Sequence, residues 1–294
     1  MKHFEARNIT CLCLRCMDFR LDSRQMHGHG ISYVVANAGA SMPVSPSDRA
    51  INLGFQVASF FLLYSQAKQD SKLVITAPSG HFDCLHVRKI WDTATGKAEM
   101  TERYQHTLYA PYLDLARHVQ SQGLTEEHSL RLLSAAKTLF DVNNFFTYPE
   151  VRGAMQSGTL KFVAYYEDPT QNPHRLMIFD PTLQRFTEPK PAKFNYLTVK
   201  YGHASPRLMD IRRNKGLLDH YEVKDAVDVI SFVNLEAERL RNGTSILLPM
   251  TKQSSGFAKH VRVVLNNQRA RFVMNGAASV ARRTARYILP RHLG

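Results

Sequence analysis

The sequence contains few cysteines, four among 294 residues. Three of them, Cys11, Cys13 and Cys16, lie too close along the chain to form the disulfide framework of a small secreted domain. This scarcity excludes a disulfide scaffold. It favours a reducing compartment, in which cysteines serve as thiolates or as buried apolar residues.

Long apolar segments are also missing. The most apolar run, residues 55–64, contains Gln56 and Ser59, whereas a membrane-spanning helix needs about 20 apolar residues. The first eight residues lack the apolar core of a signal peptide. We therefore expect no transmembrane segment and a location in the cytoplasm. With 44% hydrophobic and 21% charged residues, the composition is globular and excludes disordered and collagen-like chains.

Acidic residues are missing from the end of the chain: none follows Glu238, whereas eleven Lys and Arg residues do. Residues 190–294 hold 19 basic and 7 acidic residues, a net charge of +12, which leaves +1 of the total +13 for residues 1–189. We therefore expect two domains, 1–189 and 190–294. The basic region suits an acidic partner such as nucleic acid, anionic lipid or an acidic protein, or it forms a solvated or self-associating face.

The hydrophobic pattern alternates between strand and helix periods. Apolar runs predict strands at residues 9–15, 31–36, 72–77, 160–166, 175–179 and 245–248. Helical spacing predicts helices at residues 48–69, 102–143, 149–158, 223–240 and 277–289, and a hairpin is predicted at 259–274. The alternation indicates an α/β fold, a mainly parallel β-sheet flanked by helices, to which the basic region adds an α+β part.

Polar clusters follow the first three predicted strands, at residues 16–20, 37–40 and 80–84. In parallel sheets, ligands bind at the carboxyl ends of the strands. The three clusters are therefore expected to meet in one site.

Two of these clusters contain residues that bind metals. His81 and Cys84 form a His-x-x-Cys pair, and Cys16 lies at another strand end. Two thiolates and one imidazole are a suitable ligand set for zinc, and three protein ligands leave a fourth position open for catalysis. A single His-x-x-Cys pair is also common among residues that are merely buried.

Asp18 and Arg20 lie two residues apart, so on an extended segment they point to the same side. Arginine can hold a carboxylate through paired hydrogen bonds, which would keep Asp18 ionised. Asp18 could then accept a hydrogen bond from zinc-bound hydroxide or occupy the fourth zinc position itself. The alternative is a surface ion pair, which contributes little.

Taken together, the motifs resemble those of the beta-class carbonic anhydrases. The family's Cys-x-Asp-x-Arg motif is similar to residues 16–20, its Asn-Ala-Gly motif to residues 37–39, and its Gly-His-x-Asp-Cys motif to residues 80–84. The similarity extends over roughly residues 8–188, because residues 142–151 resemble the family's helix before its last strands and residues 158–168 resemble its terminal hairpin.

The resemblance implies a zinc enzyme that converts carbon dioxide reversibly to bicarbonate with a zinc-bound hydroxide. It implies that Cys16, His81 and Cys84 bind Zn²⁺, and that Asp18 and Arg20 form an orienting dyad. It also implies a homodimer or higher homo-oligomer. The residues expected around the substrate are those that accompany the motifs: Asn37, Ala38, Gly39, Gly80, Phe82, Asp83 and Leu85.

Two departures from the family pattern leave the ligands intact. Ala36 replaces an Arg found in many members, and Leu85 replaces a Gly. Some relatives hydrolyse carbon disulfide or carbonyl sulfide with the same chemistry, and Phe82 and Leu85 would suit such an apolar substrate. A third hypothesis is a catalytically weak zinc protein whose basic tail binds an acidic partner.

Other residues near the motifs have simpler interpretations. His86 is either a proton shuttle, because the pKa of histidine is ordinarily near 6.5, or a surface residue. Asp83 orients the site loop or caps the next helix. Cys11 and Cys13 are expected in the core.

Overall fold

The computed structural model describes residues 9–18, 21, 32–44, 54–70, 73–99, 103–171, 175–188 and 215–249. The chain divides into two compact units, Met1–Leu248 and Pro249–Gly294. This division lies beyond the predicted boundary at residue 189, because α9 (Lys215–Tyr221) contacts the sheet and α10 (Val229–Arg241) contacts a long helix of the first unit. The hairpin and helix predicted at 259–274 and 277–289 lie outside the described residues.

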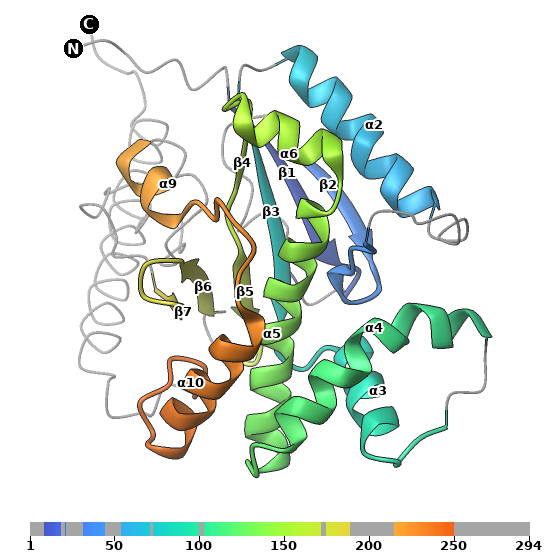
Figure 1. Ribbon diagram of the computed structural model, residues 1–294, viewed down its shortest axis with the longest axis vertical. Coiled ribbons are helices and arrows are strands. Elements are labelled where there is room, and N and C mark those ends of the chain that lie inside the picture. Colours follow the sequence, from blue (N-terminus) through green and yellow to red (C-terminus); the bar gives the residue numbers. More distant parts are fainter. Residues whose placement is uncertain are drawn as a thin grey trace, which may run out of the picture. The chain divides into compact units, whose positions relative to one another are not determined.

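The described part of the chain is built around a seven-stranded sheet (Figure 1). Its strands are β1 (Ile9–Cys16), β2 (Ser32–Asn37), β3 (Leu73–His81), β4 (Leu160–Phe162), β5 (Tyr165–Asp168), β6 (Arg175–Asp180) and β7 (Arg185–Thr187). The order is β2-β1-β3-β5-β6-β7, and β4 pairs with β3. Strands β1 to β5 pair in parallel, whereas β5, β6 and β7 pair antiparallel. The predicted α/β class with a mainly parallel sheet is confirmed.

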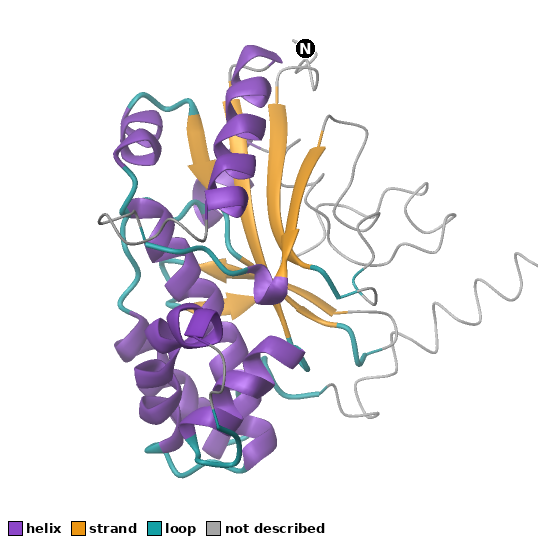
Figure 2. Ribbon diagram, turned by 90° about the vertical axis from the view of Figure 1, so that its right-hand side faces the viewer, coloured by secondary structure: helices purple, strands orange, loops and turns teal. Residues whose placement is uncertain are grey.

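Helices cover the sheet, most of them on one side (Figure 2). They include α2 (Gly54–Asp70), α3 (Leu85–Ala94), α4 (Arg103–Gln120), α5 (Glu126–Phe146), α6 (Pro149–Gln156) and the short 3-10 helix η2 (Ala38–Ala40). The region predicted as one helix at 102–143 is two, because Gly123 adopts a left-handed φ of 65° between α4 and α5. Thr125 then caps α5 by accepting a hydrogen bond from the His128 N–H. No described helix is both long and apolar enough to cross a membrane.

The two faces of β1 belong to different parts of the core. Leu12 and Leu14 pack into the large cluster that contains residues of α2 and α5. Cys11 and Cys13 face the other side, where Leu218 of α9 joins a smaller cluster. Both cysteines are buried, with their sulfurs 3.5 Å apart, which confirms the core role predicted for them.

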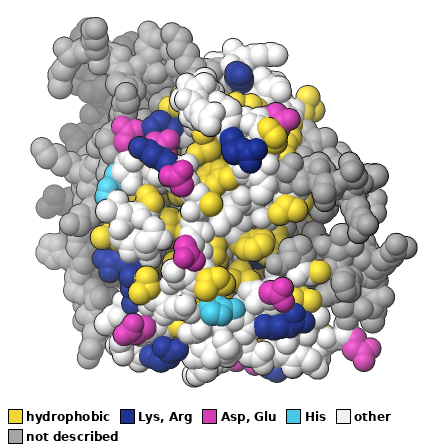
Figure 3. Space-filling view, viewed as in Figure 1, with side chains coloured by type: hydrophobic (Ala, Val, Ile, Leu, Met, Phe, Trp, Pro, Cys, Tyr) yellow, Lys and Arg dark blue, Asp and Glu magenta, His cyan; other side chains and the backbone are white. Residues whose placement is uncertain are grey.

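Charges of both signs are interspersed on the face shown in Figure 3, which is consistent with the near-neutral composition of residues 1–189. On the surface, Arg88 and Lys97 both pair with Glu126. Such exposed pairs contribute little to stability.

The first three strands end at one edge of the sheet. In the pairing of β1 with β2, Cys16 lies opposite Asn37. In the pairing of β1 with β3, Arg15 lies opposite Ser79. The polar segments that follow these strands are therefore neighbours, as the sequence predicts.

Candidate metal centre

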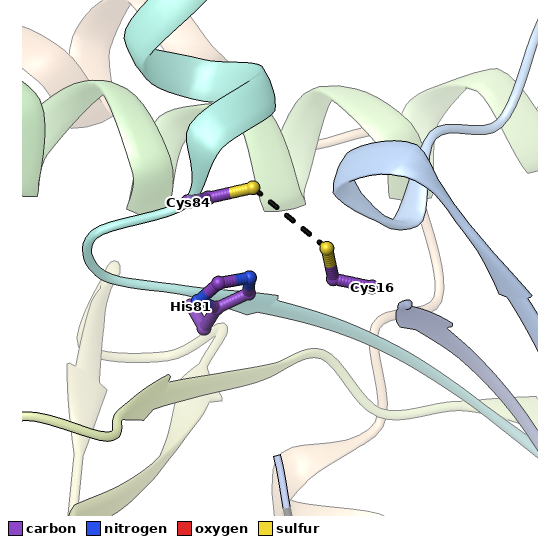
Figure 4. Close-up of side chains that lie close together, drawn as sticks. All are labelled: Cys16, His81 and Cys84. Atoms are coloured by element: carbon purple, nitrogen blue, oxygen red, sulfur yellow. Dashed lines mark hydrogen bonds between the residues drawn. The ribbon is translucent and has the colours of Figure 1, made fainter. Parts of the chain in front are cut away.

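Two thiols and one imidazole meet at this edge. Cys16 is the last residue of β1, His81 is the last residue of β3, and Cys84 immediately precedes α3. Their ligand atoms all lie within 4.8 Å of one another, and all three residues are buried. Figure 4 shows the two sulfurs pointing toward each other beside the His81 ring.

The geometry of this cluster fits zinc. The Cys16 and Cys84 sulfurs are 3.8 Å apart, and two thiolates that share one tetrahedral Zn²⁺ at about 2.3 Å each lie about 3.8 Å apart. His81 Nδ1 donates a hydrogen bond of 2.8 Å to the Phe82 carbonyl, which leaves the lone pair on Nε2. This Nε2 atom is buried and has no hydrogen-bond partner among the described residues. A buried, unsatisfied nitrogen beside two thiols is suited to a metal ion.

A hydrogen bond between the two thiols shifts their pKa values in opposite directions. The hydrogen bond from Cys84 lowers the pKa of Cys16 to about 4. The same hydrogen bond, together with burial, raises the pKa of Cys84. A metal ion that binds both sulfurs must displace the proton of the Cys84 thiol, because thiols bind metal as thiolates.

The Asn-Ala-Gly turn supports Cys16. The side-chain amide of Asn37 donates to the Ser41 carbonyl at 2.9 Å and accepts from the Ser41 N–H at 2.7 Å, which closes the turn. Gly39 has a φ of 71°, and a Cβ atom there would lie 2.5 Å from the His86 ring, so only glycine fits. The Gly39 N–H donates to Cys16 Sγ at 3.3 Å. Asn37 closes the turn and Gly39 contacts Cys16, so the turn fixes the position of Cys16. The motifs placed both residues around the substrate and did not predict this role.

The segment between the other two ligands reverses the chain. Phe82 is partly buried, and its ring lies 3.7 Å from the guanidinium carbon of Arg131. Asp83 is exposed and has a left-handed φ of 59°, a conformation that Asp adopts more readily than most residues. The reversal directs the Cys84 thiol back toward Cys16. Leu85, the next residue, is 70% exposed.

Gly80 is required for the close approach of β3 to α5. A Cβ atom at this position would lie 1.8 Å from Thr138 Oγ1. We expect Gly80→Ala to lower the free energy of unfolding by about 1–3 kcal/mol, as overpacked core substitutions do. Urea denaturation checks this result.

Two variants serve as controls for Gly80→Ala. A Cβ atom added at Gly153 in α6 would meet no other atom within 4 Å, so Gly153→Ala should be neutral or stabilise the helix by up to about 1 kcal/mol. Adding Thr138→Ala to Gly80→Ala should recover part of the loss. A Gly80→Ala protein as stable as the wild type would contradict the packing argument.

Of the predicted dyad of Asp18 and Arg20, the structure describes only Asp18. Asp18 is partly buried, and its carbonyl accepts a hydrogen bond of 3.2 Å from the Leu21 N–H. Its carboxylate is not part of the cluster formed by the three ligands. Arg20 lies outside the described residues, so its pairing with Asp18 stays a prediction.

The surface position considered for His86 is wrong. Its side chain is buried between Gly39 and Tyr112, and its Nε2 atom lies 3.2 Å from Ser41 Oγ. Burial lowers the pKa of His86 to about 2, so the ring is neutral at physiological pH. A buried, neutral imidazole does not suit the role of proton shuttle either.

A buried ion pair next to the Asn-Ala-Gly turn was not predicted from the sequence. Lys137 Nζ lies 2.7 Å from Asp141 Oδ2, and both side chains are only 2% exposed. Asp141 also accepts hydrogen bonds from the Met42 N–H at 2.9 Å and the Tyr112 hydroxyl at 2.8 Å. The available signal was a Lys and an Asp four residues apart in an otherwise apolar part of a long helix.

A second buried ion pair contacts the segment between His81 and Cys84 through the Phe82 ring. Arg131 and Asp168 are 2.8 Å apart and are 3% and 2% exposed. Arg131 also donates to the Leu247 carbonyl at 3.1 Å. Arg175 donates to the carbonyls of Ile246 and Leu248 at 2.6 and 2.8 Å. The strand predicted at 245–248 is wrong: these residues form a turn whose carbonyls are bound by arginines.

Comparisons with known proteins give similarity at the level of structure. No protein-family model and no curated protein matches the chain. The chain is similar to the beta-carbonic anhydrase CcaA, with 18% identity, a TM-score of 0.49, and coverage of 62% of this chain and 78% of that one. It is also similar to a tetrameric beta-carbonic anhydrase of the filamentous ascomycete Sordaria macrospora, with 15% identity, a TM-score of 0.43, and coverage of 56% and 79%. For CafA of the fungal pathogen Aspergillus fumigatus, the values are 15%, 0.40, 56% and 74%.

The fold and the site define an α/β protein with a buried Cys₂His centre at the carboxyl edge of a mainly parallel sheet.

Proposed function

We propose that the protein is a zinc enzyme that converts carbon dioxide reversibly to bicarbonate. The observation that carries this proposal is the buried cluster of Cys16, His81 and Cys84, with its unsatisfied imidazole nitrogen and its sulfur separation of 3.8 Å. When bound, Zn²⁺ supplies a Lewis acid that makes water acidic enough to lose a proton near neutral pH.

The residues of the chain have distinct roles in this proposal. Cys16 and Cys84 supply two negative charges and His81 a neutral nitrogen, so the bound site has no net charge. The Gly39 N–H orients Cys16, and the Phe82 carbonyl fixes the tautomer of His81. Asp18 accepts a hydrogen bond from the attacking water, and Arg20 keeps Asp18 ionised and directed.

Carbon dioxide is small and apolar, and two exposed apolar side chains lie next to the proposed ligands in the sequence. Met17 and Leu85, each next to a proposed ligand, are 68% and 70% exposed. We place the substrate among the motif residues Asn37, Ala38, Gly39, Gly80, Phe82, Asp83 and Leu85. The same two apolar side chains favour a second candidate, hydrolysis of carbon disulfide or carbonyl sulfide with the same residues.

Stopped-flow hydration of carbon dioxide at about pH 8.5, on protein of measured zinc content, tests the proposal. We expect one zinc ion per chain and a rate far above the buffer background. Asp18→Ala should lower kcat by about 10²-fold or more, as the loss of a proton-accepting group does. Asp114→Ala, which removes a carboxylate that is 91% exposed on α4, is the matched control and should retain the rate.

The outcomes separate the parts of the proposal. Protein without zinc would overturn the metal site. Zinc-loaded protein that is inactive on carbon dioxide and active on carbon disulfide would replace the substrate. Zinc-loaded protein that is inactive on both would leave a zinc protein without this chemistry.

We further propose that the chain acts as a homodimer or higher homo-oligomer in the cytoplasm. Its four cysteines, all within the described residues, form no disulfide bond, as is usual in a reducing compartment. The expectation of an oligomer comes from the family that the motifs resemble. An acidic partner for the basic end of the chain stays a prediction from its charge.

A further inference from the structure

We propose that Lys137 is a positioning residue for the metal centre: its ammonium group holds the Gly39 carbonyl, so that the Gly39 N–H stays directed at Cys16 Sγ. This inference rests on the zinc site proposed above. It assigns a role to a residue of α5 that no motif of the sequence includes.

Lys137 is fixed deep in the core. Its side chain is 2% exposed, and a buried ammonium group is unfavourable unless it is paired and hydrogen-bonded. Asp141 supplies the pairing at 2.7 Å, and the Tyr112 ring lies 4.7 Å from Nζ. The Gly39 carbonyl is a further acceptor, at 2.8 Å. The ammonium group is therefore held between a carboxylate, an aromatic ring and this carbonyl.

Gly39 needs such external support. Glycine has the widest choice of φ and ψ, so the residue itself does not fix its two flanking peptide groups. One of these groups supplies the carbonyl that Lys137 binds, and the other supplies the N–H that lies 3.3 Å from Cys16 Sγ. Holding the first group limits the rotation of the second. Hydrogen-bond partners of metal ligands tune metal affinity, and the Gly39 N–H is such a partner of Cys16.

A purely structural role for the ion pair makes a different prediction. If Lys137 and Asp141 only stabilise the core, breaking the pair from either end should have the same effect on the metal. If Lys137 positions Gly39, the two ends differ. Asp141→Asn breaks the ion pair but leaves the Lys137 nitrogen in place to donate to Gly39, whereas Lys137→Met removes the donor.

The experiment uses the full chain and two readouts other than activity. Zinc affinity is measured by competition with a chromophoric chelator, and the thiolate-to-cobalt absorption band is recorded on Co²⁺-substituted protein. We expect Lys137→Met to weaken zinc binding by about 10–100-fold and to shift the cobalt band. Asp141→Asn should stay within about threefold of the wild type, with an unchanged band. Lys161→Met, which removes an ion-paired lysine of β4, is the matched control and should bind zinc normally.

The design keeps the proposal testable if Lys137→Met does not fold. The double variant Lys137→Met/Asp141→Asn leaves no unpaired buried charge, and we expect it to show the same weakened affinity and shifted band. Wild-type affinity in either folded Lys137 variant, or equal weakening in Lys137→Met and Asp141→Asn, would overturn the role of Lys137. Wild-type protein that binds no zinc would overturn the proposed metal site instead.

Discussion

Cys84→Ser protein is expected to retain its fold, to lose its zinc and to hydrate carbon dioxide at no more than the buffer rate. A serine hydroxyl does not replace a thiolate among the ligands that bind zinc at neutral pH. The remaining pair, Cys16 and His81, would be two ligands where both structural and catalytic zinc sites use at least three protein ligands. Zinc content by elemental analysis and the stopped-flow rate are measured on the same preparation.

Cys13→Ser is the matched control for this variant. Cys13 is as buried as Cys84, with 1% and 4% exposure, but it faces the opposite side of the sheet, away from the cluster. Both variants place a hydroxyl in a buried thiol position, so both should lose a similar amount of stability. We expect Cys13→Ser to keep one zinc ion per chain. Cys84→Ser protein with full zinc and full activity would falsify the proposed ligand set.

Arg131→Met is expected to lower the free energy of unfolding by about 3–5 kcal/mol, the range seen when one partner of a buried ion pair is removed. The substitution leaves the Asp168 carboxylate buried with the Thr170 N–H and hydroxyl as donors and without its cation. It also removes the donor to the Leu247 carbonyl and the guanidinium above the Phe82 ring. Urea denaturation, with the slope m compared between proteins, measures the loss.

The control for Arg131→Met is an exposed pair with the same charges. Arg117 and Asp114 are 2.8 Å apart but are 58% and 91% exposed, and Arg117→Met should cost at most about 1 kcal/mol. Equal losses of stability in Arg131→Met and Arg117→Met would contradict the argument that burial makes the loss of Arg131 more destabilising.

The sequence predicted that Cys16, His81 and Cys84 lie close together, because local signals coincide there. The strands that contain Cys16 and His81 have clear apolar patterns, and their ends are marked by polar residues. Parallel pairing then brings the ends together with no further information. The close fit between predicted strands at 9–15 and 31–36 and the observed β1 and β2 reflects the same strong patterns.

The support around the site could not be predicted in this way, because it depends on contacts distant in sequence. Lys137 reaches Gly39 across 98 residues, and Arg131 reaches Leu247 across 116. A helix pattern shows that α5 is buried but not which neighbour a charged side chain meets. The apolar residues at 245–248 match a strand pattern, yet tertiary contacts with arginines determine their conformation. His86 follows a proposed ligand closely and still faces the core.

The attachment of the 245–248 turn has a consequence for how its sequence can change. Arg131 and Arg175 bind main-chain oxygens there, so this contact is indifferent to which side chains Ile246 and Leu248 carry. Both side chains pack against the core, so apolar substitutions can accumulate at these positions while the turn keeps its place. The arginines have no such freedom, because a lysine offers one ammonium group where the guanidinium of Arg131 serves a carboxylate, a carbonyl and an aromatic ring together. Homologues compared by sequence would therefore preserve Arg131 and Arg175 and vary the side chains of the residues whose carbonyls they bind.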